Sequence, residues 1–558
     1  MIDRAAVVAS LLLDYADDPA AGVAVYRRAI ASGHSGLADS PDVHVNLALY
    51  LMALGESVEA EATFRKALGL APDHVPSLHN LGFLCESQHR TQEAEALYRQ
   101  VLALEPSHVK ATINLANVLQ SLMQRDLALE LMRHAARLAP DNYLPAAFEL
   151  FESTYDPSGT DATIFAKAKQ AADLRCQGLQ TPKQMPMVRP WQSGERPLRV
   201  GFVSGDFKAH PVGFFLQDWL PHVDKSRLTL QAFSMLERDD VVSHKLRPQF
   251  ESWHNIATMS DEAVQTLAAS LGLDVLIDLS GHTDMNRLPL FARRAAPVQI
   301  SWLGWYATTG VVNMDYFLTD RISSPASSAA HHSERLLYLP DTRLCLCQPI
   351  FAPDVSSLPA LQNKHITFGS LQALAKITDA TLALWQQVLA QIPTAHLHIR
   401  CAQFGQGEMV ALFEQRLRDF ELPLARIELL APVPYAAYLE SYQSIDLILD
   451  TIPFSGGTTT AEALWMGVPT LTLLGTTLIA RQGASLMSAA GLADWAVDSQ
   501  REYIAKALYW SEHVEALAAL RSSLRERVRT SPLFDSPRFA LAFTEAMEAA
   551  AVGMTSVS

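Results

Sequence analysis

Cysteine is scarce in this chain of 558 residues. Five cysteines are spread along it, and only Cys345 and Cys347 lie close together. A single C-x-C pair without a second half is weak evidence for zinc, so we expect ordinary reduced thiols. Basic residues are also few: the formal net charge is −15. That balance argues against nucleic acids and anionic membranes as general partners, but leaves room for a local anion site.

Long apolar runs are lacking as well, and none approaches the ~18 residues of a membrane span. The N-terminus carries Asp3 and Arg4, and Asp14, Asp17 and Asp18 interrupt the short apolar stretch that follows. This pattern does not match a signal peptide. We therefore expect a cytoplasmic protein without an integral membrane segment. Its length is enough for two to four domains.

A period of 34 residues is present in the first quarter of the chain. One unit, residues 41–74, reads as two amphipathic helices joined by a turn at residues 55–57. A helix-turn-helix period of this length indicates tetratricopeptide repeats, which hold peptides. The repeated positions are Asn46, Asn80 and Asn114; Pro72, Pro106 and Pro140; and Ala60, Ala94 and Ala128.

From residue 198 onward short apolar runs alternate with helical segments. Runs without polar alternation predict strands buried on both faces, hence parallel sheets covered by helices. The fold class we predict is an α-helical repeat superhelix followed by two α/β units of the doubly wound, Rossmann-like kind. The candidate strands are 198–204, 274–279 and 298–302 in the first unit, and 365–370, 396–400, 426–430, 445–451 and 470–474 in the second.

Four segments follow from this organisation. Residues 1–142 are repeats, the first of them degenerate; 143–195 are a helical, proline-rich linker with Pro182, Pro186, Pro190 and, just beyond it, Pro197. Residues 196–357 are the first α/β lobe and 358–558 the second, closed by long amphipathic helices at 501–550.

The strongest chemical signal is a glycine/threonine loop after the strand 445–451. Gly456 and Gly457 allow the backbone to approach a phosphate, and the helix that follows presents free N–H groups in its first turn. Thr458 and Thr459 add hydroxyl donors. The loop lacks the Lys-Ser/Thr ending of a Walker motif. A capped helix after a turn is the plain alternative.

Two charged residues accompany this loop. Glu462 is expected near the first helical turn and reaching outward, where it can accept ribose hydroxyls; its alternative role is to favour the helix dipole. Lys376 follows the strand 365–370 in a loop of small and apolar residues. It is a candidate partner of a diphosphate, and otherwise a solvated lysine.

Histidines follow two strands of the first lobe, where ligands of doubly wound sheets bind. His210 lies in the loop after 198–204, and Pro211 biases it toward an extended backbone, so it is a candidate general base. His282 follows 274–279 and is a weaker candidate. The aromatic residues around Trp305 can stack on a sugar or peptide, although we favour core packing as their role.

Together these motifs resemble the O-linked N-acetylglucosamine transferases, in particular a bacterial homologue. The matching segments are 200–207 leading to His210-Pro211, Trp302-Leu303-Gly304 with Thr309-Gly310, Met314-Asp315-Tyr316, Asp450-Thr451, Gly456-Gly457-Thr458-Thr459 and Leu464-Trp465. The resemblance implies a GT-B enzyme that transfers N-acetylglucosamine, with inversion and without a metal or other cofactor, from UDP-N-acetylglucosamine to Ser or Thr hydroxyls of proteins.

The resemblance also implies roles for single residues. His210, Asp206 and Lys376 match catalytic positions, and Pro211 belongs with the acceptor. Asn46, Asn80 and Asn114 match asparagines that bind the backbone of protein substrates, or else pack the helical turns. The donor-binding positions implied are Gln372, Thr309, Gly456, Gly457, Thr458, Thr459 and Glu462.

Two departures from the animal members are visible. Glu462 stands where they have aspartate, and Gly457 where they have histidine, which removes a side-chain contact to the nucleotide. The repeat array is also much shorter, and the large insertion between the lobes is missing.

In the expected displacement, the acceptor hydroxyl attacks the anomeric carbon as UDP leaves. Lys376 and the N–H groups near Thr458 stabilise the charge that grows on the diphosphate. Either His210 takes the hydroxyl proton, or it positions substrate while Asp206 receives the proton through water.

Other classes of function remain open from sequence. The chain can be a binding scaffold with a nucleotide-sugar site but little turnover, or the same fold with another UDP-sugar or an asparagine acceptor. A UDP-sugar epimerase or hydrolase has no evident use for peptide-binding repeats.

Overall fold

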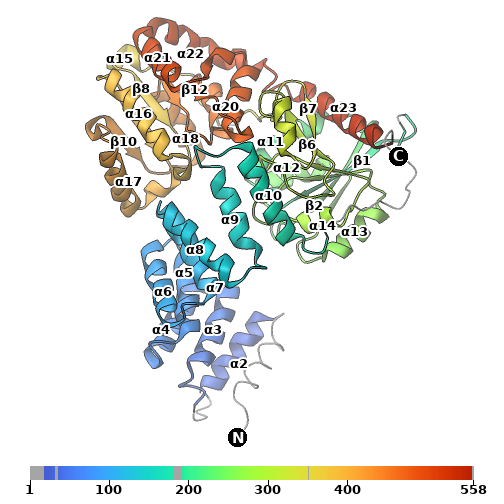
Figure 1. Cartoon of the computed structure of the whole chain (residues 1–558), viewed down its shortest axis with the longest axis vertical. Coiled ribbons are helices and arrows are strands. Elements are labelled where there is room, and N and C mark those ends of the chain that lie inside the picture. The colour runs from blue at the N-terminus through green and yellow to red at the C-terminus, as the bar shows by residue number, and fades with distance from the viewer. Residues whose placement is uncertain (1–17, 32–35, 180–190, 193, 350, 556–558) are drawn as a thin grey trace. The chain divides into compact units, whose positions relative to one another are not determined.

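The computed structural model describes residues 18–31, 36–179, 191–192, 194–349 and 351–555 (Figure 1). They fall into two compact units, Met1–Glu149 and Leu150–Ser558. Residues 1–17 of the degenerate first repeat, and the linker prolines Pro182, Pro186 and Pro190, lie outside the described residues. No helix in the described ranges is long and apolar enough to cross a membrane.

The first unit is built from helices in antiparallel pairs, as the 34-residue period predicts. Ala60, Ala94 and Ala128 are completely buried, because the small side chain lets the paired helices approach closely. Each second helix of a pair ends two residues before the repeated proline, which cannot continue it. The helices are α2 (Pro19–Ala31), α3 (Pro41–Ala53), α4 (Ser57–Leu70), α5 (Val75–Ser87), α6 (Thr91–Leu104), α7 (Val109–Ser121) and α8 (Arg125–Leu138); α9 (Tyr143–Ser153) runs across the division between the units.

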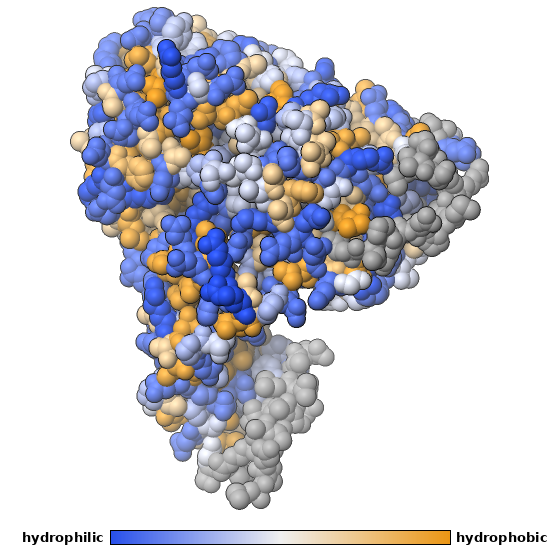
Figure 2. All heavy atoms as spheres, viewed as in Figure 1, coloured by the Kyte–Doolittle hydropathy of each residue, from blue (hydrophilic) through white to orange (hydrophobic). Residues whose placement is uncertain are grey.

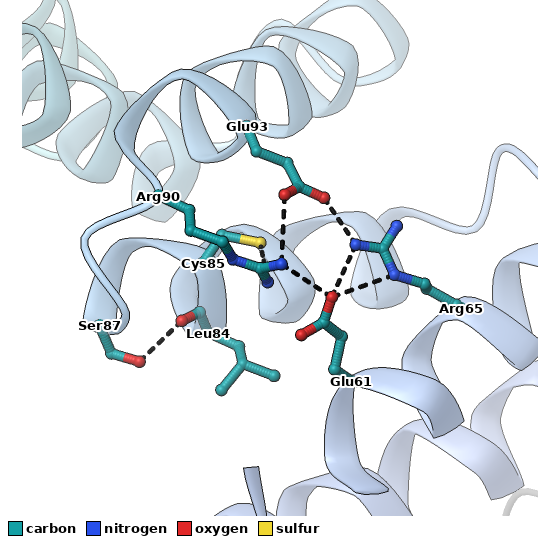
Figure 3. A network of polar contacts seen from close by, with 7 residues as sticks. All are labelled: Glu61, Arg65, Leu84, Cys85, Ser87, Arg90 and Glu93. Carbon is teal, nitrogen blue, oxygen red and sulfur yellow. Dashed lines mark hydrogen bonds and ion pairs between the residues drawn. The ribbon is translucent and has the colours of Figure 1, made fainter. Parts of the chain in front are cut away.

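A network of charges links neighbouring repeats (Figure 3). Arg90, just before α6, contacts Glu61 of α4 at 2.9 Å and Glu93 of α6 at 3.4 Å. Arg65 of α4 contacts the same two carboxylates, at 2.7 Å each. Arg90 also donates to the Cys85 sulfur at 2.9 Å. This arrangement ties α4, α5 and α6 together on the outside of the helical core.

The second unit contains two parallel sheets. The first has seven strands in the order β3-β2-β1-β4-β5-β6-β7, and the second has six in the order β10-β9-β8-β11-β12-β13. In both, the chain reverses its direction of growth between two adjacent strands, β1/β4 and β8/β11. Loops after these strands are where ligands of such sheets bind.

The first sheet consists of β1 (Leu198–Ser204), β2 (Leu228–Ser234), β3 (Ser252–Asn255), β4 (Val275–Asp278), β5 (Val298–Ser301), β6 (Tyr316–Asp320) and β7 (Arg335–Leu339). The second consists of β8 (Thr367–Ser370), β9 (His396–Arg400), β10 (Ile427–Leu430), β11 (Leu447–Leu449), β12 (Thr470–Leu473) and β13 (Ala496–Val497).

Helices cover the sheets. The α-helices of this unit are α10 (Asp161–Arg175), α11 (Pro211–Leu216), α12 (Val241–Leu246), α13 (Asp261–Ser270), α14 (Leu288–Ala292), α15 (Ala360–Asn363), α16 (Asp379–Gln391), α17 (Gly407–Asp419), α18 (Tyr435–Ser441), α19 (Thr458–Trp465), α20 (Leu478–Ala489), α21 (Gln500–Glu512), α22 (Val514–Arg529) and α23 (Ser536–Thr555). The 3₁₀ helices are η1 (Leu220–His222), η2 (Arg247–Gln249), η3 (Ala326–His331), η4 (Leu374–Lys376), η5 (Ala402–Gly405), η6 (Leu424–Arg426), η7 (Tyr442–Ser444) and η8 (Ala493–Trp495).

All eight strands expected from apolar runs are present, with ends that differ by up to two residues. The sequence patterns did not reveal β2, β3, β6, β7 and β13. In β2 the buried Gln231 interrupts the apolar run, and β3 is a partly exposed edge strand. The predicted fold class is confirmed: helical repeats are followed by two doubly wound parallel sheets.

The two lobes contact each other through α20. Ser485 donates to Asp320 of β6 at 2.9 Å, and Arg481 donates to the Ile322 carbonyl at 2.6 Å. The C-terminal helix α23 returns to the first lobe, where Phe543 packs against Trp219 with ring centroids 4.7 Å apart. Figure 2 shows hydrophilic and hydrophobic residues interspersed over the face that it presents.

Candidate active site

The glycine/threonine loop joins β11 to α19. The Gly456 N–H donates to Asp450 Oδ1 at 2.8 Å, which anchors the loop to the end of the strand. A Cβ on Gly456 would lie 2.3 Å from Thr460 Oγ1 and 2.5 Å from Gln372 Nε2. Only glycine therefore fits between these polar groups.

The N-terminus of α19 has unused hydrogen-bonding capacity. Gly457 is its N-cap, and the N–H groups of the first turn have no acceptor within the helix. The hydroxyls of Thr459 and Thr460 are buried and find no partner among the described residues. Buried donors of this kind normally bond something, so this end of α19 is suited to an anionic ligand.

Lys376 lies beside this helix end, as expected for a diphosphate partner. Its ammonium donates to Gln372 Oε1 at 3.3 Å and lies 4.3 Å from the centre of the Phe454 ring. Loss of hydration lowers the pKa of Lys376 to about 8, although the charge of Asp450 opposes that shift. The ammonium has no carboxylate within ion-pair distance in the described parts of the chain, so an anionic ligand would stabilise it.

Glu462 is placed differently from our expectation. It does not reach outward in the first turn of α19 but is buried just beyond it, with 7% of its surface exposed. Tyr435 and Tyr438 of α18 donate to its two oxygens at 2.9 and 3.0 Å. Burial raises the pKa of Glu462 to about 7. The carboxylate keeps unused lone pairs, because each oxygen accepts one tyrosine hydroxyl.

His210 and Asp206 form a second polar cluster, in the first lobe. His210 is the N-cap of α11 and has an extended backbone, as Pro211 predicts. Its Nδ1 lies 3.6 Å from Asp206 Oδ2 and 3.4 Å from the Val212 nitrogen. Burial lowers the pKa of His210, against the opposing charge of Asp206. A histidine that is neutral near pH 7 is suited to accept a proton.

Two other first-lobe residues have structural contacts. His282, the weaker base candidate, is buried and its Nε2 contacts the Thr309 carbonyl at 2.7 Å. Burial lowers its pKa to about 4. Thr309 is fully buried, and its backbone N–H donates to Glu334 at 2.7 Å. Its hydroxyl also donates to Glu334, and its contact with the donor stays a prediction.

The repeat asparagines are partly engaged within the first unit. Asn46 is buried and hydrogen-bonds Tyr26. Asn80 donates to the Pro76 carbonyl at 2.8 Å, and Asn114 donates to the Tyr98 hydroxyl at 3.2 Å. Asn80 and Asn114 remain partly exposed. Their binding of acceptor backbone stays a prediction, and helix packing accounts for Asn46.

The structure thus brings Gln372, Lys376, Gly456, Thr459 and Glu462 to one end of the second sheet. Sequence reasoning missed the tyrosines that surround Glu462. Their spacing could have revealed them, because residues 435, 438 and 442 lie on one face of a helical segment. Within the described ranges, no group of three or more His, Cys, Asp or Glu residues is arranged to hold a metal ion.

Two family profiles match the sequence. Glycosyl transferase family 41 matches residues 160–346 and 356–543, and the tetratricopeptide repeat matches residues 39–106. Among curated proteins, the "Probable UDP-N-acetylglucosamine--peptide N-acetylglucosaminyltransferase SPINDLY" of Solanum lycopersicum is 31% identical over 411 residues, which are 72% of this chain and 44% of that protein. The protein of the same name from Arabidopsis thaliana is 30% identical over 418 residues, 74% and 45% of the two chains. The chain therefore spans less than half the length of these relatives.

A solved structure is similar over nearly the whole chain. A mutant of the Thermobaculum terrenum O-GlcNAc transferase superposes with a TM-score of 0.84 at 30% identity, covering 93% of this chain and 98% of that one. The similarity extends over both the helical repeats and the two lobes.

Proposed function

Because this chain belongs to glycosyl transferase family 41, we propose that it transfers N-acetylglucosamine from UDP-N-acetylglucosamine to serine or threonine hydroxyls of polypeptides that its repeats bind. The observation that carries the proposal is Lys376, a weakly hydrated cation beside a helix N-terminus with unpaired threonine hydroxyls. The names of the relatives and of the similar structure point to the same donor sugar and acceptor class.

The donor would bind at the carboxyl end of the second sheet. Its diphosphate lies against the first turn of α19 and Lys376. Its ribose hydroxyls donate hydrogen bonds to the carboxylate of Glu462. Tyr435, which hydrogen-bonds that carboxylate, is 46% exposed and provides an aromatic surface next to the nucleoside.

The reaction is a single displacement. The acceptor oxygen forms a bond to the anomeric carbon on the face opposite the phosphate, so the configuration inverts as the carbon–oxygen bond to UDP breaks. Negative charge grows on the diphosphate, where Lys376 and the N–H groups of α19 stabilise it more than in the ground state. The hydroxyl proton passes to His210, or through water to Asp206. Because these groups supply the electrostatic stabilisation, the reaction does not require a metal.

The test is transfer of label from radioactive UDP-N-acetylglucosamine to proteins in a lysate of the host. Lys376→Ala is the inactive control, and Lys225→Ala, which changes an exposed lysine, is the matched one. We expect labelled protein that Lys376→Ala abolishes and that β-elimination releases, as an O-linked sugar requires. Protein that binds UDP but transfers no label would contradict the proposal and favour a scaffold or another donor sugar.

The two roles of Lys376 are separable by kinetics. A transition-state role predicts that Lys376→Ala lowers kcat more than it weakens UDP-sugar binding. Equal losses in both would mean that the lysine serves binding alone.

A further inference from the structure

Two glutamine side chains converge on the Gly456-Gly457 turn. Gln372 Nε2 lies 2.5 Å from the position that a Cβ of Gly456 would take, and Gln482 Nε2 lies 2.9 Å from that of Gly457. Both glutamines are buried, with 2% and 8% of their surfaces exposed. The sequence pointed to Gln372 but not to Gln482, which comes from the middle of α20, 25 residues after Gly457.

A cation fixes the orientation of each amide. Lys376 donates to Gln372 Oε1 at 3.3 Å, and Arg343 Nη1 donates to Gln482 Oε1 at 3.3 Å. Ammonium and guanidinium groups only donate hydrogen bonds, so each amide must turn its oxygen toward the cation. Both NH₂ groups consequently face the glycine turn.

Arg343 is an unusual buried cation. It is 1% exposed, and its Nη2 donates to the carbonyls of Leu303 and Trp305 at 3.0 and 3.4 Å, while its Nε has no hydrogen-bond partner among the described residues. Its guanidinium forms no ion pair with a carboxylate in the described part of the chain. The charge of Asp320 stabilises this cation only in part, because burial still lowers the pKa of Arg343 to about 10. An anion bound nearby would offset the remaining cost of burial.

Gln482 has hydrogen-bonding capacity to spare. One N–H of its amide contacts the Gly456 carbonyl at the long distance of 3.5 Å. The second has no partner among the described residues. The amide lies beside Gly457, the N-cap of α19, whose first turn also carries the unpaired hydroxyl of Thr460, a residue that is 1% exposed.

We propose that Gln482, oriented by Arg343, donates this N–H to the diphosphate of a nucleotide-sugar donor and fills the place that a side chain at position 457 would occupy. The proposal rests on the proposed function in taking a nucleoside diphosphate as the ligand. Gln482 is then a binding residue, and Arg343 is a positioning residue that acts through it from the other lobe.

Calorimetric titration of the full chain with UDP and with uridine tests this assignment. Gln482→Leu should weaken UDP binding about tenfold to a hundredfold, as loss of a hydrogen bond to a charged group does, and leave uridine binding within about twofold. Gln482→Glu keeps the size and the contact with Arg343, so it should fold even if the leucine variant does not. It should bind UDP at least as weakly, since a carboxylate cannot donate and repels phosphate. Gln387→Leu, at an exposed position of α16, is the matched control.

Arg343 is tested through a double variant. If it acts by orienting Gln482, Arg343→Met with Gln482→Leu loses no more UDP affinity than the more damaging single change. Additive losses would overturn the positioning role.

The remaining outcomes distinguish failure of this inference from failure of the proposed function. If UDP binds to wild type and weakens in Lys376→Ala but not in either Gln482 variant, the inference fails and the proposed function stands. Equal losses of UDP and uridine would also overturn it, because they would place Gln482 at the nucleoside. A wild-type chain that does not bind UDP would overturn both.

Discussion

The protonation of His210 depends on two competing neighbours at the same nitrogen. Asp206 favours a proton on Nδ1, while the Val212 N–H requires a lone pair there. Only the first arrangement leaves a lone pair on Nε2 that can accept the proton of an acceptor hydroxyl.

We therefore expect Asp206→Asn to lower kcat by about tenfold or more and His210→Ala to lower it by about 10²–10⁴. Steady-state kinetics at saturating donor measure both. If His210→Ala turns over within a few-fold of wild type, the histidine is not the base, and the route through water to Asp206 gains support.

The titration of the Glu462 carboxyl group predicts that donor affinity depends on pH. Its pKa is about 7, because burial disfavours the charged form. Above pH 7 the carboxylate accepts ribose hydroxyls, and as pH falls through 7 it becomes protonated and loses acceptor strength. Lys376, with a pKa of about 8, gains charge over part of the same range, so the effect of Glu462 is read from the affinity for UDP relative to that of Glu462→Gln. This ratio should fall between pH 8 and pH 6: Glu462→Gln should bind more weakly at pH 8, and the two proteins should converge at pH 6. A constant ratio of the two affinities over this range would contradict the role.

At the scale of elements, the turn from β1 into α11 depends on Gly213. A Cβ there would lie 2.2 Å from the Lys208 carbonyl oxygen and 3.0 Å from a methyl of Val242, so the Asp206–His210 loop would have to move. Gly213→Ala should lower kcat at least about tenfold, given the sensitivity of catalysis to misplacement. UDP affinity should stay within about twofold, since the groups that we propose to bind the nucleotide belong to the second lobe. Gly407→Ala, where a Cβ meets nothing within 4 Å, is the matched control. Parallel losses of kcat and UDP affinity would contradict this division.

The charge network of Figure 3 joins three helices of the repeats, α4, α5 and α6. Arg90 is 34% exposed and Glu61 21%, so each contact is worth little in water. We expect Arg90→Met to destabilise the repeats by about 1 kcal/mol, and the difference to shrink at 1 M salt. Hydrogen exchange of the α5 and α6 amides measures this loss of stability. Arg99→Met, which removes only the pair with Glu95 one turn away, should cost less; an equal cost would mean that the network adds nothing.

At the scale of the catalytic unit, the two lobes share buried polar contacts at α20. Asp320 accepts hydrogen bonds from the Ser485 hydroxyl and the Arg343 backbone N–H, at 2.9 and 3.0 Å. Asp320→Ala would leave the buried backbone N–H groups of Arg343 and Ser323 without their acceptor, which should cost at least about 2 kcal/mol. Because the contact with Ser485 crosses between lobes, we expect β6 and α20 to lose hydrogen-exchange protection together. Ser485→Ala removes only this hydroxyl, with its contacts to Asp320 and Thr342, and should cost about 1 kcal/mol. Loss of protection in only one lobe would show that the lobes are independent.

Much of the architecture could be predicted from the sequence, because it depends on periodic patterns among neighbouring residues. The 34-residue period and the uninterrupted apolar runs predicted the repeats and eight strands, since helix pairs and buried parallel strands impose these patterns on neighbouring residues. The loop at Gly456 could also be predicted, because glycine and threonine between a strand and a helix form a local motif that suits a phosphate.

The partners of the site residues were decided only by tertiary structure. Whether Glu462 reached solvent or was buried depended on Tyr438, 24 residues away. The contact of Arg343 with Gln482 spans 139 residues and two lobes. Local sequence patterns describe faces of single helices and strands, whereas burial, pKa and hydrogen-bond orientation arise where different elements meet. The sequence therefore determined the kind of protein and the loops that carry its chemistry, and the packing of the two sheets against α18 and α20 determined how those loops are held.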